Sequence, residues 1–242
     1  MIVIPMLGKS SRFFSAGYKE PKYKLPLNGG SVFSHSVSSF KRYFNCKPFL
    51  FLVRSDFNAA KFVSENAIEL GIRDFRIIEF SENTEGQADT VLQGTRDYGD
   101  DEPLIIFNID TIRHDFIAPS DQEFADGFLE VFQGHGNNWS FVERDKGGRV
   151  IRTAEKSRIS IHCSNGMYGF RRLRDYREAF RRSSDSILIE NGEVYVAPLY
   201  NDLIRRGLDI RCIELPCSAI SLCGTPDEYQ SLISQSKVNH NN

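Results

Sequence analysis

The sequence predicts an α/β fold whose centre is a doubly wound, mostly parallel sheet. The chain has 242 residues, of which 40% are hydrophobic and 26% charged, which is typical of one soluble globular domain. In the first half, short apolar runs alternate with amphipathic segments, as in repeated strand–helix–strand units. The runs are apolar throughout, which favours strands buried on both faces. Because ligands bind at the carboxyl ends of such strands, we expect a site in the loops after Met6 and Phe107.

The first half supplies the parallel strands and the helices that cover them. Runs rich in β-branched and aromatic residues predict strands at residues 2–6, 48–53, 75–78 and 104–107. Apolar residues spaced three and four positions apart predict helices at residues 31–44, 57–70 and 87–98. Each predicted helix lies between two predicted strands, which is the arrangement that parallel strands require.

The second half is less regular but continues the same domain. We expect a hairpin whose strands, 139–143 and 149–153, flank a turn with two glycines. Further strands are predicted at residues 167–170, 209–215 and 219–222, and helices at residues 194–206 and 226–234. No linker or repeat divides the chain, so residues 1–236 are predicted to form a single domain. The polar residues 237–242 are predicted to be a disordered tail.

Composition excludes several classes of function. The 30 basic and 32 acidic residues give a formal net charge of −2, which provides no electrostatic reason to bind nucleic acid. No apolar run approaches the ~20 residues that a membrane-spanning helix needs. The five cysteines form no CxxC pair, and the amino terminus lacks the pattern of a secretory signal. We therefore expect a reduced, cytoplasmic protein that does not insert into membranes.

A loop rich in small residues follows the first predicted strand, at residues 7–13. Small residues allow backbone N–H groups to approach phosphate oxygens closely. Within and after this loop, Arg12 offers a planar fork suited to phosphate, and Lys22 offers a compact positive charge. The pattern indicates phosphate binding, but a surface loop that carries two solvated cations explains it equally well.

Three fragments of this region together resemble a known family. The fragments are, in order, Gly8-x-x-x-Arg12-Phe13, Pro21-Lys22 and Leu25-Pro26-Leu27. They resemble the nucleotidyltransferases that activate sugar 1-phosphates and phosphorylated alcohols, of the glucose-1-phosphate thymidylyltransferase and phosphocholine cytidylyltransferase type. The chain departs from the family's pattern at Ser10, where the family has glycine, and by the extra Tyr23-Lys24 spacing.

The resemblance continues along the chain in the family's order. The further fragments are Glu85-Gly86-Gln87-Ala88, Phe107-Asn108-Ile109-Asp110, Ala154-Glu155-Lys156 with Ser164-Asn165-Gly166-Met167-Tyr168, and Gly224-Thr225-Pro226. Each fragment is short, but together they cover nearly all of the chain. The resemblance therefore implies this family's fold, a Rossmann-like mixed sheet of the nucleotide-diphospho-sugar transferase type. It also implies that residues 1–115 or so bind the nucleotide and that about 116–236 bind the acceptor.

The same resemblance implies roles for individual residues. Arg12 would hold the β- and γ-phosphates of a nucleoside triphosphate, Lys22 the α-phosphate, and Asp110 a Mg²⁺ ion. The other nucleotide-binding residues implied are Leu7, Gly8, Lys9, Ser10, Ser11, Glu85 and Gly86. The acceptor-binding residues implied are Glu155, Lys156, Asn165, Gly166 and Tyr195.

One departure affects the implied metal site. The family's second metal-binding carboxylate lies two residues before the glycine of its last motif, and here that residue is Leu222. Leucine cannot bind Mg²⁺, which prefers oxygen ligands. Either Asp110 holds the ion together with phosphates and waters, or Ser221 or Asp202 supplies an oxygen, or catalysis is impaired.

We therefore expect an enzyme that joins a nucleoside triphosphate to a sugar phosphate or small phosphorylated alcohol and releases pyrophosphate. The attacking phosphate is already an anion near neutral pH, which agrees with a sequence that has no evident Ser-His-Asp or Cys-His grouping. The resemblance further implies a setting in surface polysaccharide or capsule synthesis, and pairing as a homodimer.

Two other classes of protein remain open at this stage. A metal-dependent glycosyltransferase shares this sheet but has Asp-x-Asp where this chain has Asn108-Ile-Asp110. A nucleotide-binding sensor that keeps the pocket and lacks turnover is suggested by Leu222. Within the favoured class, thymidylyl or uridylyl transfer to a sugar competes with cytidylyl transfer to a phosphoalcohol.

Overall fold

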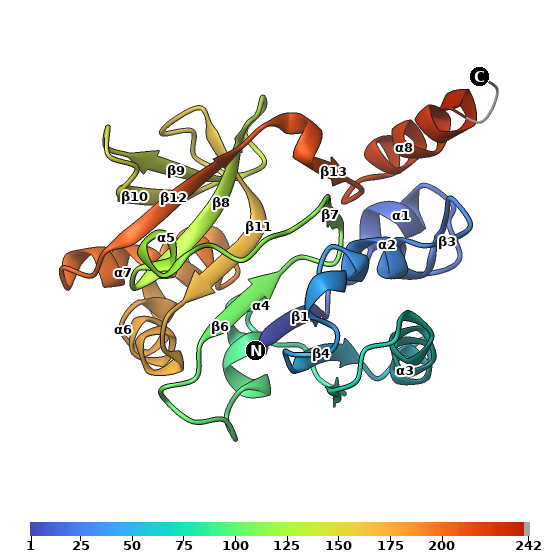
Figure 1. The fold of residues 1–242 in the computed structure, drawn as a ribbon, viewed down its shortest axis with the longest axis horizontal. Helices are drawn as coiled ribbons and strands as arrows, with labels where there is room; N and C mark the ends of the chain where they lie inside the picture. The colour runs from blue at the N-terminus through green and yellow to red at the C-terminus, as the bar shows by residue number, and fades with distance from the viewer. Residues whose placement is uncertain (240–242) are drawn as a thin grey trace.

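The computed structural model describes residues 1–239, with side chains up to residue 235. Its largest sheet contains β1 (Ile2–Met6), β4 (Phe49–Arg54), β5 (Phe75–Phe80), β6 (Leu104–Phe107), β8 (Gly127–Gln133), β9 (Ser140–Arg144), β10 (Val150–Glu155), β11 (His162–Phe170) and β12 (Ile210–Leu215). The strand order is β10-β9-β11-β6-β1-β4-β5, and β8 joins β11 to β12 (Figure 1). Two small sheets pair β2 (Pro26–Leu27) with β3 (Gly30–Ser31), and β7 (Thr111–Arg113) with β13 (Ile220–Leu222).

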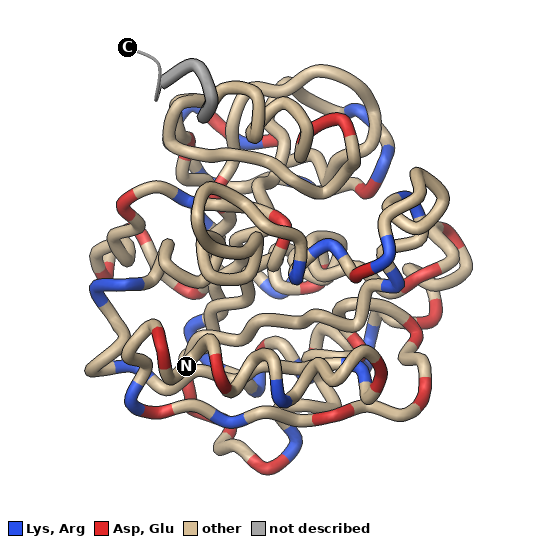
Figure 2. Tube along the Cα trace, turned by 90° about the vertical axis from the view of Figure 1, so that its right-hand side faces the viewer, with Lys and Arg blue, Asp and Glu red and all other residues tan. Residues whose placement is uncertain are grey.

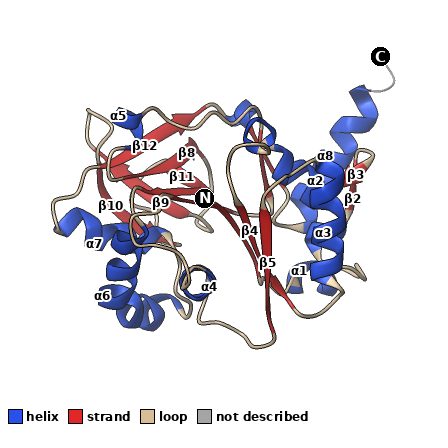
Figure 3. Ribbon diagram, turned by 60° about the horizontal axis from the view of Figure 1, so that its bottom comes forward, coloured by secondary structure: helices blue, strands red, loops and turns tan. Residues whose placement is uncertain are grey.

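Helices cover both faces of the parallel part of the sheet. They are α1 (Ser11–Ser15), α2 (Val32–Ser38), α3 (Ala59–Leu70), α4 (Gln87–Gly94), α5 (Asp121–Phe124), α6 (Leu173–Asn191), α7 (Tyr200–Arg205) and α8 (Pro226–Asn239). Figure 3 shows α2 and α3 on one side of β4 and β5, and α4 on the other. No helix in the described residues is apolar over a length that would cross a bilayer.

The predicted α/β fold is confirmed. Strands β6, β1, β4 and β5 run parallel, whereas β11 is antiparallel to β6, β8 and β9. The central strand β1 is buried along its whole length, with Ile2 and Ile4 packed towards α2 and α3 and Val3 towards α4 and α6. An apolar run without polar alternation is therefore the pattern of a strand covered on both faces.

Several predicted boundaries differ from the structure. The helix predicted at 31–44 ends at Ser38, and a 3-10 turn follows at Lys41–Tyr43. The hydroxyl of Ser39 accepts a hydrogen bond from the backbone N–H of Arg113, at 2.9 Å, so the chain leaves the helix to meet β7. The helix predicted at 194–206 is a 3-10 turn at Ala197–Leu199 followed by α7, and Pro198 lies in that turn.

The structure adds elements that sequence patterns did not define. Strand β8 carries the buried Glu130 in its middle, which interrupts the apolar run. Strand β11 begins five residues before the predicted strand 167–170. At the carboxyl end, residues 237–239 continue α8 instead of starting a disordered tail, and residues 240–242 lie outside the described part of the chain.

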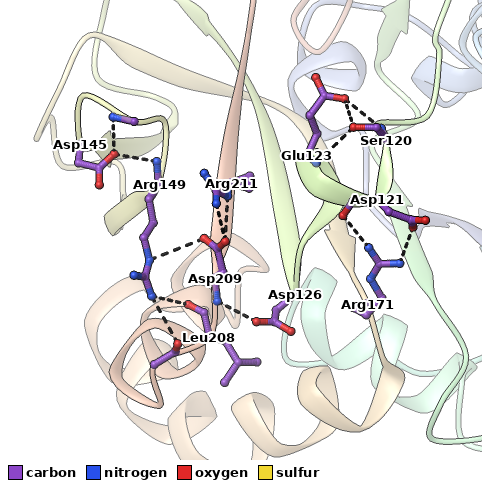
Figure 4. A network of polar contacts seen from close by, with 12 residues as sticks. Ser120, Asp121, Glu123, Asp126, Asp145, Arg149, Arg171, Leu208, Asp209 and Arg211 are labelled. Atoms are coloured by element: carbon purple, nitrogen blue, oxygen red, sulfur yellow. Dashed lines mark hydrogen bonds and ion pairs between the residues drawn. The ribbon is translucent and has the colours of Figure 1, made fainter.

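Charged residues at the periphery hold loops together rather than forming one patch. In Figure 4, Asp209 accepts hydrogen bonds from Arg211, and its backbone N–H donates to Asp126. The guanidinium of Arg149 bonds to the carbonyl of Leu208 in the same network. Figure 2 shows basic and acidic residues interspersed along the chain.

Candidate active site

A cavity of about 950 Å³ opens where three parallel strands end. Its walls come from the loops that follow β1, β5 and β6. The rest of the wall comes from the hairpin strands β9 and β10, from segment 193–195 and from the start of α8. The cavity therefore lies at the carboxyl edge of the sheet, where a ligand site was expected.

The loop after β1 is held in shape by Ser10 and Phe13. Ser10 has a φ of +52°, in the left-handed region that favours glycine, which explains why the related pattern has glycine there. Its hydroxyl accepts a hydrogen bond from the backbone N–H of Lys22, at 3.1 Å. The Phe13 ring is buried and packs edge-on against Tyr229 of α8, at 6.1 Å between ring centres. These contacts link the loop to the segment that carries Lys22 and to α8.

Lys22 and Asp110 form an ion pair across the cavity. The Lys22 Nζ lies 2.5 Å from Oδ2 of Asp110, which directly follows β6, and their side chains are 18% and 23% exposed. Burial favours the neutral form of this carboxyl, but Lys22 and, to a smaller extent, Arg12 outweigh burial and hold the pKa of Asp110 below its usual value. The three residues expected to carry the chemistry line the same cavity.

A second carboxylate lies beside Asp110. A Cβ on Gly224 would stand 2.9 Å from Oδ2 of Asp110 and 3.5 Å from Oε2 of Glu228, so a side chain at residue 224 would crowd the first carboxylate and contact the second. Glu228 lies in the first turn of α8 and takes part in a capping box with Thr225. Its Oε2 accepts a hydrogen bond from the backbone N–H of Thr225, and the Thr225 hydroxyl accepts one from the backbone N–H of Glu228. Leu222 lies in β13 opposite Thr111 and lines the same cavity.

The loop after β5 is joined to the segment that reaches the acceptor side. Gly86 has a φ of +143°, and a Cβ there would stand 2.6 Å from the backbone nitrogen of Val194. Val194 donates its N–H to the carbonyl of Glu85 and accepts from the N–H of Ala88, at 2.7 and 2.9 Å. Gly86 lines the cavity, whereas Glu85 is not among the described residues that line it.

Of the residues expected to bind the acceptor, Glu155, Asn165 and Tyr195 line the cavity. Burial raises the pKa of Glu155, although the hydroxyl of Ser140 donates a hydrogen bond to its carboxylate. Lys156 donates to the Tyr195 hydroxyl at 2.6 Å, and its ammonium lies 4.6 Å from the centre of the Tyr195 ring. This lysine is exposed and lies outside the described lining of the cavity, although it contacts Tyr195, which is part of that lining.

Gly166 also lies behind the cavity wall. It adopts a φ of +88°, and a Cβ there would stand 2.3 Å from Nδ2 of Asn108. The side chain of Asn108 accepts a hydrogen bond from Nε2 of Gln87, at 2.5 Å. Gly166 thus makes room for Asn108, and it is Asn108 and Gln87 that line the cavity.

Most residues expected in the site meet in this cavity. Those that line it are Leu7, Gly8, Lys9, Ser10, Ser11, Arg12, Lys22, Gly86, Asp110, Glu155, Asn165 and Tyr195. Lining residues that received no site role from the sequence include Gln87, Asn108 and Tyr168, which stand in the quoted fragments, and Trp139, Ser140, Glu193 and Glu228, which do not. For Glu228 a signal was present, because Thr225-x-x-Glu228 is a capping-box pattern, but it indicates a helix start and no chemistry.

Comparison with known proteins places the chain in a family. No protein-family model and no curated protein matches it. Among solved structures, the nucleoside-diphosphate-sugar pyrophosphorylase from Vibrio cholerae RC9 is 48% identical, with a TM-score of 0.91 over 97% of this chain and 100% of that chain. The chain belongs to the nucleoside-diphosphate-sugar pyrophosphorylases. The resemblance to the nucleotidyltransferases, noted from its motifs, is confirmed.

More distant pyrophosphorylases and transferases share the fold. A putative glucose-1-phosphate thymidylyltransferase from Bacillus anthracis is 14% identical, with a TM-score of 0.75 over 98% of this chain and 94% of that chain. The inositol-1-phosphate CTP transferase from T. maritima is 13% identical, with a TM-score of 0.71 over 98% of this chain and 95% of that chain. At this level of identity, the likeness extends to the fold.

The pyrophosphorylase cavity offers oxygen ligands of the kind that Mg²⁺ prefers. No group of three or more His, Cys, Asp or Glu side chains in the described residues is arranged to hold a metal. Mg²⁺ commonly uses one or two carboxylates together with phosphate oxygens and waters, so a full protein cage is not required. The ionised Asp110, which lines the cavity, fits that requirement.

Proposed function

We propose that this pyrophosphorylase transfers a nucleoside monophosphate from a nucleoside triphosphate to a sugar phosphate or small phosphorylated alcohol, releasing pyrophosphate. The observation that carries the proposal is the convergence of Arg12, Lys22 and Asp110 on one cavity at the end of β1 and β6. The 48% identity to a nucleoside-diphosphate-sugar pyrophosphorylase supports a sugar phosphate as acceptor. Surface polysaccharide or capsule synthesis is the setting we propose for the product.

The reaction needs positive charge more than it needs a base. A phosphate oxygen of the acceptor attacks the α-phosphorus, a new P–O bond forms, and the bond to the β-phosphate oxygen breaks with its electron pair leaving on pyrophosphate. The attacking monoester carries ≈ −1.5 to −2 charge at pH 7, so no proton has to be removed. Catalysis then depends on cations held ready where negative charge accumulates.

Two side chains supply that charge. Lys22, held by the Ser10 hydroxyl through its backbone, would neutralise the oxygens on the α-phosphorus. Arg12, on the exposed side of the loop, would hold the departing phosphates with its planar fork. Asp110 keeps the Lys22 ammonium aimed into the cavity through their 2.5 Å ion pair.

Asp110 would also hold Mg²⁺. When bound, that ion supplies further positive charge to the phosphate oxygens and orients the triphosphate. The lowered pKa of Asp110 keeps the carboxyl ionised at neutral pH, as a metal ligand must be.

The alternative functions differ in what the cavity residues do. In a metal-dependent glycosyltransferase, the position of Asn108 would carry a second aspartate, but here its amide oxygen is occupied by Gln87. A nucleotide sensor without turnover is favoured by one observation, the leucine at position 222 beside Asp110.

Pyrophosphate release tests the proposal. The wild-type chain is incubated with Mg²⁺, each of four nucleoside triphosphates, and a panel of sugar 1-phosphates and phosphoalcohols. We expect release that requires both substrates, is abolished by EDTA, and is lost in Asp110→Asn but kept in Asp185→Asn, an exposed change on α6. Nucleotide binding without release for any pair would support the sensor instead.

A further inference from the structure

We propose that Glu228 supplies the second carboxylate of the metal site, in place of the residue that Leu222 occupies. This inference rests on the proposed function, because it concerns the ion that the proposed reaction uses. It assigns to the first turn of α8 a charge that the family's motif carries two residues before Gly224.

The position of Glu228 is the first support. Its Oε2 lies 3.5 Å, and Oδ2 of Asp110 lies 2.9 Å, from the point where a Cβ on Gly224 would stand, so both oxygens lie on the same side of this glycine. A side chain at residue 224 would contact both carboxylates. Glycine at this position therefore lets two acidic side chains line the cavity near one another, and carboxylate oxygens are the ligands that a hard cation prefers.

The hydrogen bonds of Glu228 leave it able to bind a cation. The carboxylate is held by a single hydrogen bond, from the N–H of Thr225 to Oε2 at 3.0 Å, and no described residue donates to Oε1. No basic side chain forms an ion pair with Glu228 among the residues described, whereas Asp110 is paired with Lys22. Glu228 is thus fixed in orientation but keeps uncompensated charge facing the cavity.

The packing of α8 against the rest of the protein fixes the position of Glu228. Tyr229, the next residue, is buried, and its hydroxyl donates to the carbonyl of Pro26 at 2.6 Å. Its ring packs against Phe13 and Tyr18 of the opening loop. Since that loop also carries Arg12 and is bonded to Lys22, the helix that places Glu228 is built into the same unit as the catalytic cations.

The arrangement explains why leucine is acceptable at position 222. Residue 222 ends β13 opposite Thr111, and Glu228 lines the same cavity from the first turn of α8. Because a bound Mg²⁺ ion commonly keeps several water ligands, Glu228 can bind the ion directly or through one of these waters. Leu222 then packs against the cluster around Phe132 and Ile220 and carries no metal-binding role.

The test measures metal binding rather than activity. Binding of Mn²⁺ is followed by electron paramagnetic resonance, with and without the α,β-methylene form of the triphosphate that supports turnover. Glu228→Gln removes the charge but keeps the helix cap, since glutamine also serves at this position of a capping box. We expect Mn²⁺ affinity to fall roughly 10–100-fold in this variant, with an unchanged melting temperature.

Two further variants make the test specific. Asp227→Asn removes the same charge from the same turn, but Asp227 is exposed and outside the described lining, so its Mn²⁺ affinity should equal that of the wild type. Adding Leu222→Asp to Glu228→Gln returns a carboxylate at the family's position and should restore Mn²⁺ binding.

The outcomes separate this inference from the proposed function. If wild-type protein releases pyrophosphate but Glu228→Gln binds Mn²⁺ as tightly as wild type, Glu228 is not a metal residue and the proposed function stands. If Asp227→Asn loses as much Mn²⁺ affinity as Glu228→Gln, then the total negative charge of the helix start matters and not the position of Glu228. That result would also overturn the inference. If the wild type neither binds Mn²⁺ nor releases pyrophosphate, the proposed function itself is wrong.

Discussion

At the scale of single residues, the ion pair between Lys22 and Asp110 governs the charge of the cavity. The ammonium helps to keep a partly buried carboxyl ionised, and the carboxylate in turn aims the ammonium at the place where the α-phosphate would lie under the proposed function. Neither group does this alone, because burial on its own favours the neutral form of Asp110.

Replacing Lys22 by methionine tests its role in turnover. Met keeps the length of the side chain and removes the charge, so the rate of pyrophosphate release should fall by roughly 10²–10³-fold, as for the loss of one transition-state donor. Lys19→Met, at an exposed site outside the described lining, is the control and should keep the wild-type rate. A decrease of less than about threefold in Lys22→Met, or ~0.7 kcal/mol, would contradict the assignment.

Sequence patterns identified Arg12, Lys22 and Asp110 as candidate site residues but did not identify every residue that lines the cavity with them. Arg12, Lys22 and Asp110 stand in motifs whose spacing is visible in the chain, and they line one cavity. Glu228 reaches the cavity only because α8 docks on Phe13, some two hundred residues earlier in the sequence, and no local pattern encodes that contact. Lys156 stands in a motif too, but it is exposed, donates to Tyr195 and lies outside the described lining of the cavity.

At the scale of elements, the start of α4 is joined to the acceptor side through one backbone segment. Val194 exchanges hydrogen bonds with Glu85 and Ala88 across Gly86, where no side chain fits. The cavity-lining loop after β5 and the segment that carries Tyr195 are therefore joined by backbone hydrogen bonds.

Gly86→Ala should break this unit. A Cβ would stand 2.6 Å from a backbone nitrogen that cannot move aside cheaply, in addition to the strain of a φ of +143°. Gly71→Ala is the matched control, because Gly71 also has a positive φ, +82°, but nothing lies within 4 Å. We expect Gly71→Ala to cost about 1–3 kcal/mol of unfolding free energy, and Gly86→Ala to cost clearly more and to abolish triphosphate binding in titration calorimetry. Equal losses in the two variants would show that the contact with Val194 is unimportant.

Elements with a clear pattern were predictable, and those that tertiary contacts decide were not. Strand β1 was predicted at its observed bounds, because an apolar run from the amino terminus leads directly into a loop rich in small and polar residues. The helix predicted at 31–44 stops at Ser38 because Ser39 and Phe40 leave it to contact Arg113 and Phe107. Strand β8 was missed because Glu130 interrupts its apolar run.

At the scale of the whole molecule, Glu130 ties the two halves of the chain together. Its carboxylate accepts hydrogen bonds from Arg113 of β7 at 3.0 Å and from Asn165 of β11 at 2.9 Å, and only 2% of its side chain is exposed. Burial raises the pKa of Glu130, and the Arg113 charge opposes that rise. The parallel half and the antiparallel half thus share a buried ion pair next to the cavity.

Arg113→Met should destabilise the fold in a pH-dependent way. Without the cation, the pKa of Glu130 rises further above its unfolded value, and stability is lost as the pH rises through that pKa. Unfolding in urea should show a deficit of roughly 3–5 kcal/mol at pH 8 and a smaller one at pH 5. Adding Glu130→Gln removes the unpaired charge and should recover part of the loss at pH 8. A deficit that is equal at both pH values would contradict this account.

The path of the phosphorus atoms tests the central claim most directly. Two preparations of the preferred triphosphate, labelled with ³²P at the α or at the γ position, are turned over with the acceptor, and the products are separated. The account predicts that α label enters the new nucleoside diphosphate conjugate and that γ label leaves as pyrophosphate. Transfer of the γ label to the acceptor, or formation of a conjugate without labelled pyrophosphate, would contradict displacement at the α-phosphorus.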